Sequence, residues 1–158
     1  MDLIVRAVDV GSGNTKFVTS VVSSPSGADI RCVSFPSVAY PSSDGLPSWP
    51  SGDRRKTTFI PIGALFYEVG PEVALAADTF RAKQLHDEYT ETPEYMALLR
   101  GALSMMKVSR IDLLVVGLPV ALFAVKKAAL EKAMTGPHDI GGGKAVTVGK
   151  ALAVAQPQ

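Results

Sequence analysis

The stretch Asp9-Val10-Gly11-Ser12-Gly13-Asn14-Thr15-Lys16 separates two segments that are typical of β-strands. Residues 3–10 are mostly apolar, as in a strand that is covered on both faces, and residues 17–22 are rich in β-branched side chains. Two glycines within three positions favour a tight turn between these strands. The sequence therefore predicts a strand, a glycine-rich loop and a second strand, and the rest of the fold is built outward from this hairpin.

The loop itself carries groups that suit a phosphate and its metal ion. Gly11 and Gly13 lack side chains, so several backbone N–H groups can converge on one anion, to which Ser12 adds a hydroxyl donor. Lys16 adds a positive charge. Asp9, at the end of the first strand, can hold a hydrated Mg²⁺, the usual companion of nucleotide phosphates. The same residue types also form ordinary polar turns, so the stretch alone leaves both interpretations open.

Two better-known phosphate-binding loops do not fit this chain. The dinucleotide-binding pattern needs Gly-x-Gly-x-x-Gly at the start of a helix, whereas Lys16 stands at the last glycine position and a strand follows. Gly143-Lys144 resembles the end of a P-loop, but Ala145 stands where that motif has Ser or Thr. The glycines at 141–143 are therefore predicted to form a hairpin turn.

The remaining pattern alternates strands and helices only in its second half. Strands are predicted near 30–35, at 57–62, at 65–69 and at 111–116, helices from Thr92-Pro93 onward and over 120–134, and a final strand pair at 146–148 and 152–154. Residues 36–52, with four Pro, five Ser and two Gly, are predicted to be a loop. This order predicts an α/β fold with a mixed sheet, in which an antiparallel β-meander is followed by α-β-α-β, and argues against a doubly wound Rossmann domain.

The composition is that of a globular domain. Of 158 residues, 47% are hydrophobic and 20% are charged, which excludes global disorder. The formal net charge of +1 gives no basic excess for non-specific nucleic-acid binding. The longest uncharged apolar run, 113–125, is shorter than the roughly 20 residues that span a bilayer. We therefore expect a cytoplasmic protein that binds neither nucleic acid directly nor a membrane.

The single Cys32 excludes an internal disulfide and a multi-cysteine zinc site. It stands in the mostly apolar stretch Ile30-Arg31-Cys32-Val33, so a buried and unreactive thiol is predicted. Neither His86 nor His138 has a second His or Cys at the spacing of a metal site. No metal centre built from these residue types is expected.

The pattern Asp9-x-Gly11-x-Gly13-Asn14-x-Lys16 on the first hairpin resembles the first phosphate loop of the actin, heat-shock chaperone and sugar-kinase superfamily. Residues 95–103, 112–120 and 154–158 narrow the resemblance to the N-terminal domain of bacterial actin-like plasmid-segregation proteins of the ParM and StbA kind, among them the actin-like proteins of the PRTRC plasmid system. The resemblance covers essentially the whole chain, and its specific parts are the first loop and Gly117-Leu118-Pro119. It implies the ribonuclease H-like fold of domain I of an actin-like ATPase.

The resemblance also implies roles for individual residues. The β- and γ-phosphates of ATP would be bound by Gly11, Ser12, Gly13, Asn14, Thr15 and Lys16. Asp9 would approach Mg²⁺ through water. Gln158 would be the catalytic residue, because a Gln or Glu after the last strand of this domain orients the hydrolytic water in this family.

The domain organisation follows from the same resemblance. Residues 1–158 would be one actin-like N-terminal domain, with a core over 1–35 and 92–158 and a small subdomain inserted over 36–91 that makes filament contacts. Family members are much longer, because ATP lies in a cleft between two similar domains. The second nucleotide-binding domain is therefore expected to be absent from this chain.

The implied function is that of half an ATPase that binds ATP and Mg²⁺, associates with itself into filaments, and segregates plasmid DNA through a DNA-binding adaptor. Two alternatives stay open. One is a non-catalytic assembly module that keeps the actin-like fold, and the other is half of a small-molecule kinase of the same superfamily.

Overall fold

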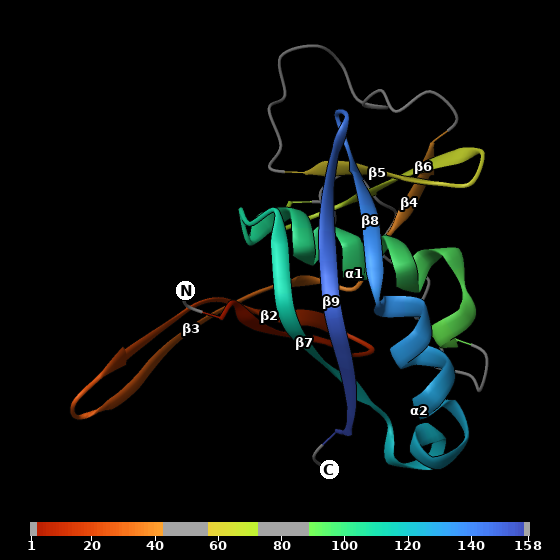
Figure 1. Ribbon diagram of the computed structural model, residues 1–158. Coiled ribbons are helices and arrows are strands. Elements are labelled where there is room, and N and C mark those ends of the chain that lie inside the picture. Colours follow the sequence, from red (N-terminus) through yellow and green to blue (C-terminus); the bar gives the residue numbers. More distant parts are fainter. Residues whose placement is uncertain (1–2, 43–56, 73–88, 157–158) are drawn as a thin grey trace.

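A computed structural model describes residues 3–42, 57–72 and 89–156 (Figure 1). In chain order its elements are β1 (Val5–Val10), β2 (Asn14–Ser24), β3 (Gly27–Pro36), β4 (Tyr40–Ser42), β5 (Thr58–Ile62), β6 (Leu65–Val69), the short 3₁₀ helix η2 (Tyr89–Glu91), α1 (Pro93–Met105), β7 (Arg110–Leu118), α2 (Val120–Met134), β8 (Gly136–Gly141) and β9 (Lys144–Ala155). The predicted α/β order is confirmed.

The main sheet has six strands in the order β3-β2-β1-β7-β9-β8. The first three strands pair antiparallel as the predicted meander, whereas β7 pairs parallel with both β1 and β9. Strand β8 returns antiparallel to β9 at the far edge. Parallel pairing brings the carboxyl ends of β1, β7 and β9 to the same end of the sheet, which is where the first loop lies.

A second, small sheet has the order β4-β6-β5. Its β5–β6 hairpin turns at Gly63, whose φ of 60° is left-handed, as the sequence predicted for Gly63-Ala64. Helix α1 contacts β5 and β6 of this sheet as well as β1, β2 and β8 of the main sheet (Figure 1). The prediction that residues 36–52 form a loop is wrong in part, because Tyr40–Ser42 forms strand β4 through pairing with the distant strand β6. Residues 43–56 lie outside the described residues.

Helix α1 begins as its sequence predicts and contributes one face to the core. The Thr92 hydroxyl accepts a hydrogen bond from the Tyr95 N–H at 3.2 Å, which caps the first turn. The apolar stripe of the helix is buried: Tyr95, Leu98, Leu99, Ala102 and Leu103. Gly101 lies so close to β6 that an added Cβ would stand 2.5 Å from the Val69 Cγ2. Burial of one face of the helix between two sheets therefore holds the domain together.

Two further predictions, about strands and burial, are wrong. The expected final pair at 146–148 and 152–154 is one continuous strand, β9, and its hairpin partner is β8, a strand that was not predicted. Cys32 is exposed rather than buried. It lies on the edge strand β3, so the apolar character of its sequence neighbours does not correspond to a covered face. Both errors depend on which strands pair and which faces of the sheet are covered, and local patterns do not encode this.

Candidate functional site

The glycine-rich loop joins β1 to β2 as predicted, and Asp9 and Lys16 are partners in the register of the two strands. Because directly opposed residues in an antiparallel pair point to the same face, both side chains emerge on one side of the sheet. The Gly11 N–H donates to the Asn14 carbonyl oxygen at 3.0 Å and closes the turn. A Cβ at Gly11 would lie 3.0 Å from the same oxygen, so the turn has little room for a side chain.

The predicted phosphate-binding residues fall into two groups in the structure. Ser12, Gly13 and Asn14 are exposed at the tip of the loop, where their polar groups are accessible to a ligand. Thr15 is fully buried, and its hydroxyl shares a 2.9 Å hydrogen bond with the Ser37 hydroxyl. The Ser37 N–H also donates to the Gly13 carbonyl oxygen at 3.0 Å. Thr15 and the Gly11 N–H are therefore engaged in shaping the loop, and the exposed tip is left for binding.

Asp9 and Lys16 line a hollow of about 230 Å³ on the face of the main sheet. Gly117 at the end of β7 and Gln156 just after β9 line the same hollow. These four residues come from four elements, or from the segments that follow them, at the end of the sheet where the parallel strands terminate. The structure thus brings a carboxylate, an ammonium group and a carboxamide together beside the exposed loop.

Gln156 is a site residue that the sequence did not reveal. Its Nε2 donates a hydrogen bond to Oδ1 of Asp9, and its own N–H donates to the Leu118 carbonyl oxygen at 2.7 Å. Gly117 makes room for this contact, because an added Cβ would lie 2.9 Å from Oδ1 of Asp9 and 3.0 Å from Cγ of Gln156. The sequence signal was the position of Gln156 at the end of the last strand. This position points to the site only when the strand order is known, because β9 lies two strands from β1, which carries Asp9.

Gln158, the predicted catalytic residue, lies outside the described residues. It follows Gln156 by two positions in the sequence. Its role as the group that orients water stays a prediction.

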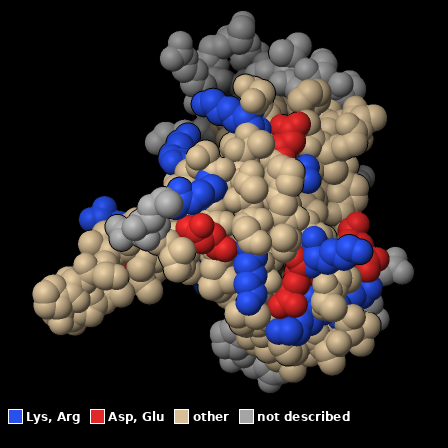
Figure 2. Space-filling view, in the orientation of Figure 1, with Lys and Arg blue, Asp and Glu red and all other residues tan. Residues whose placement is uncertain are grey.

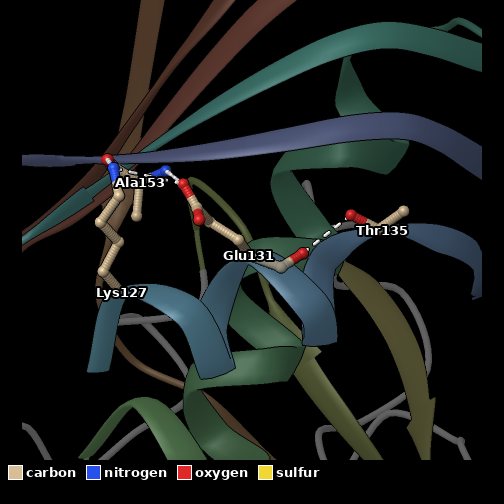
Figure 3. A network of polar contacts seen from close by, with 4 residues as sticks. All are labelled: Lys127, Glu131, Thr135 and Ala153. Carbon is tan, nitrogen blue, oxygen red and sulfur yellow. Dashed lines mark hydrogen bonds and ion pairs between the residues drawn. The ribbon is translucent and has the colours of Figure 1, made fainter. Parts of the chain in front are cut away.

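Helix α2 fixes the strand that carries Gln156 (Figure 3). The Ala153 N–H donates to Oε2 of Glu131 at 2.9 Å, and the Ala153 carbonyl oxygen accepts from Nζ of Lys127 at 3.1 Å. Lys127 and Glu131 also form an ion pair at 3.5 Å, one helical turn apart. The hydrogen bond from Ala153 is the main reason that the pKa of Glu131 is lowered, and Lys127 adds to it against the effect of burial. This network holds β9 three residues before Gln156.

The donor set at the hollow fits a phosphate-bound Mg²⁺. Mg²⁺ prefers hard oxygen ligands, and in nucleotide sites it uses one or two carboxylates together with phosphate oxygens and water. Asp9 supplies one such carboxylate next to the cationic Lys16. Within residues 3–42, 57–72 and 89–156, no three His, Cys, Asp or Glu side chains gather into a metal cage. Asp9 and Lys16 fit a metal ion that is bound together with an anion, because one carboxylate and one ammonium group lie on the same face.

Comparison with protein families decides the relationship. Residues 7–158 match the model of the N-terminal domain of actin-like proteins. The chain belongs to this family. A comparison with curated protein sequences gives no significant match. Among the described residues of this actin-like domain, no helix is both long and apolar enough to cross a membrane.

Solved structures show the same fold. The apo ParM protein of psk41 superposes with a TM-score of 0.69 at 15% identity, over 99% of this chain and 50% of that one. The AlfA filament from Bacillus subtilis plasmid pLS32 gives a TM-score of 0.67 at 18% identity, over 96% and 55%. The archaeal actin homologue Ta0583 gives 0.63 at 18%, over 98% and 45%. The actin-like domain thus spans about half the length of these proteins.

Proposed function

We propose that this actin-like domain binds the phosphates of Mg-ATP at its β1–β2 loop and forms half of an ATPase that polymerises to segregate plasmid DNA. The observation that carries the proposal is the convergence of Asp9, Lys16 and Gln156 on one hollow beside the exposed loop tip. Two similar structures support it by what they contain: an AlfA filament is bound to AMPPNP, and Ta0583 forms a complex with ADP.

Each group at the site has a definite chemical task in this proposal. The accessible backbone N–H groups and the hydroxyl at positions 12–14 would donate to phosphate oxygens, and Lys16 would neutralise part of their charge. Asp9 would hold Mg²⁺ through water, with Oδ2 free for this because Gln156 occupies Oδ1. Bound Mg²⁺ supplies charge neutralisation on the phosphate oxygens. Gln156 is thus a positioning residue, and Gln158 would orient the attacking water.

The organisation of the whole protein belongs to the same proposal. A core over 1–35 and 92–158 would bind the nucleotide, and a small subdomain over 36–91 would make filament contacts. The described strands within 36–91 support this division, since β4, β5 and β6 pair among themselves in a separate sheet. A second domain would complete the cleft, and a DNA-binding adaptor in the cytoplasm would connect the filament to its plasmid.

Titration of Mg-ATP into the chain tests the phosphate site. We expect weak, roughly millimolar affinity, because half of the cleft is supplied elsewhere. Lys16→Ala and Asp9→Asn should each weaken binding by about tenfold or more, and Asp9→Asn keeps the oxygen that accepts from Gln156. Lys144→Ala, in the exposed β8–β9 hairpin, is the matched control and should bind as the unmodified chain does.

Two results would overturn the proposal. One is the absence of saturable heat or amide chemical-shift changes at residues 11–16 when Mg-ATP is added. The other is equal affinity of the Lys16→Ala and Lys144→Ala variants. Either result, together with concentration-dependent self-association, would favour an assembly module that does not use nucleotide.

A further inference from the structure

The β2–β3 hairpin projects from the body of the domain as an arm, defined here as residues 20–32 (Figures 1 and 2). Every residue from 21 to 32 is exposed, including Val21, Val22 and Ile30, whose side chains are 39%, 58% and 55% accessible. The visible face of the arm is mostly uncharged in Figure 2. An isolated two-stranded hairpin is marginally stable in water, so this one gains from a further partner.

Strand β3 forms the outer edge of the main sheet. Ser24 and Gly27 pair across the two-residue turn, and in an antiparallel ladder hydrogen-bonded pairs alternate with non-hydrogen-bonded ones. Asp29 and Arg31 therefore direct their backbone groups toward β2, whereas Ile30 directs its N–H and carbonyl oxygen outward, as do residues 28 and 32. The arm thus offers a row of backbone donors and acceptors to another strand.

Several devices that protect an edge strand are missing from the arm part of β3. Residues 27–35 contain neither Lys nor Pro, and the bulge in the hairpin lies in β2, between Val18 and Ser20. The two charges on this stretch have opposite signs, Asp29 and Arg31, and they flank Ile30 symmetrically. A strand with this pattern complements a second, antiparallel copy of itself.

We infer that β3 is an interface between two copies of this chain, paired antiparallel about a two-fold axis at Ile30. In this register the two Ile30 residues face each other with their outward backbone groups, and Asp29 of each copy faces Arg31 of the other. Ala28 then faces Cys32. Val21, which lies opposite Ile30 within each hairpin, extends the apolar contact on the same face.

The symmetry of this contact limits what it can do. An isologous contact uses the same surface on both partners, so it closes a pair and cannot propagate along a filament. It would join two chains, or two filaments side by side, through a sheet that continues across both copies. The contact does not require nucleotide, so it can be tested independently of the proposed ATPase function.

Cysteine cross-linking tests the register directly. In a Cys32→Ser background, Ile30→Cys places the two thiols opposite each other, at a Cα separation of about 5.5 Å that suits a disulfide. Native Cys32 lies four residues from its copy in this register, about 14 Å away, which is too far. We expect rapid formation of a disulfide-linked dimer for Ile30→Cys and slow formation for native Cys32.

Val22→Cys in the same Cys32→Ser background is the matched control. Val22 is about as exposed as Ile30 but lies on β2, opposite Asp29, and its backbone groups point toward β3 rather than outward. Its dimer should form at least about tenfold more slowly than that of Ile30→Cys, because only random collisions bring the thiols together. Equal rates for the two variants would overturn the inference.

Charge exchange tests the complementarity without any cross-link. Sedimentation equilibrium of the unmodified chain at roughly 0.1–1 mM should show a monomer of 16.6 kDa in equilibrium with its dimer. Asp29→Arg should shift the chain to monomer because like charges then face each other, and adding Arg31→Asp should restore the dimer. Circular dichroism checks that each variant is folded. A strictly monomeric unmodified chain, or a dimer that Asp29→Arg leaves intact, would refute the interface.

Discussion

Helix α2 places two side chains on the backbone of Ala153 at one side of the main sheet, whereas no described element covers the outer backbone of β3 at the other side. Strand β8 pairs with β9 only as far as Val148, so residues 149–155 would otherwise be an open edge as well. Glu131 accepts from the N–H and Lys127 donates to the carbonyl oxygen, which are the two bonds that a neighbouring strand would make.

The two edges of the sheet therefore differ in whether their outer backbone groups are bound by other parts of the domain. Lys127 and Glu131, one helical turn apart, bind the backbone of β9 in place of a neighbouring strand. They do so just before Gln156, at the candidate phosphate site. The β3 edge lies on a projecting arm, where unpaired backbone groups cost little because water reaches them. An edge left open in this way is available for association. The predictions that follow test both edges.

The largest loss of stability is expected from substitution of His138, which joins strand β8 to the end of helix α2. This side chain is 1% exposed on β8, with Nε2 2.6 Å from the Met134 carbonyl oxygen at the end of α2 and Nδ1 accepting from Nε of Arg100 at 3.2 Å. His138→Ala leaves a cavity and two polar groups without partners, so we expect a loss of about 3 kcal/mol in the free energy of unfolding. Denaturant unfolding measures it, and a loss below about 1 kcal/mol would contradict this anchoring role.

A pH dependence should follow from the same side chain. Burial lowers the pKa of His138 below its ordinary value of 6.5; the hydrogen bond with Met134 opposes this shift, and the Arg100 charge adds to it. The unfolded chain therefore binds a proton near pH 6.5 that the folded chain does not, and stability falls as the pH drops through this value. Unfolding curves between pH 7.5 and 5 should show this slope, and His138→Gln should flatten it.

Substitution of Glu131 is expected to have a smaller effect, confined to the exchange of one backbone amide. Glu131→Ala removes the acceptor of the Ala153 N–H, so the exchange of this amide with solvent should accelerate by about tenfold or more, while amides in β1 remain protected. Glu131→Gln keeps an oxygen acceptor and is the control. Equal exchange rates in the two variants would show that α2 does not replace a strand at this edge.

The smallest effect on stability is expected at the open edge. Ile30→Lys should change the free energy of unfolding by less than about 0.5 kcal/mol at low protein concentration, because the side chain is 55% exposed. Thermal or denaturant unfolding of the dilute chain measures this. A loss comparable with that of His138→Ala would mean that the arm is part of the core, and the contrast between the edges would disappear.

Prediction from the sequence succeeded where the signal is local. The cap at Thr92, the helix over 120–134 and the turn at Gly63-Ala64 depend on residues within a few positions of one another, and the structure has all of them. Prediction failed for β8, because neither the positive φ of Gly136 nor the burial of His138 between two helices leaves a periodic trace in the sequence.

The same division applies to the candidate site. The sequence by itself determined the strand-loop-strand around residues 9–16 and the chemical groups on it, since steric freedom and hydrogen-bonding capacity belong to the residues themselves. Only the tertiary structure decided that Gln156 binds Asp9, that Thr15 is buried against Ser37, and that Cys32 lies on an exposed edge. Those contacts join segments 22 to 147 residues apart or depend on which strand ends the sheet, and such pairings are set by the packing of the whole chain.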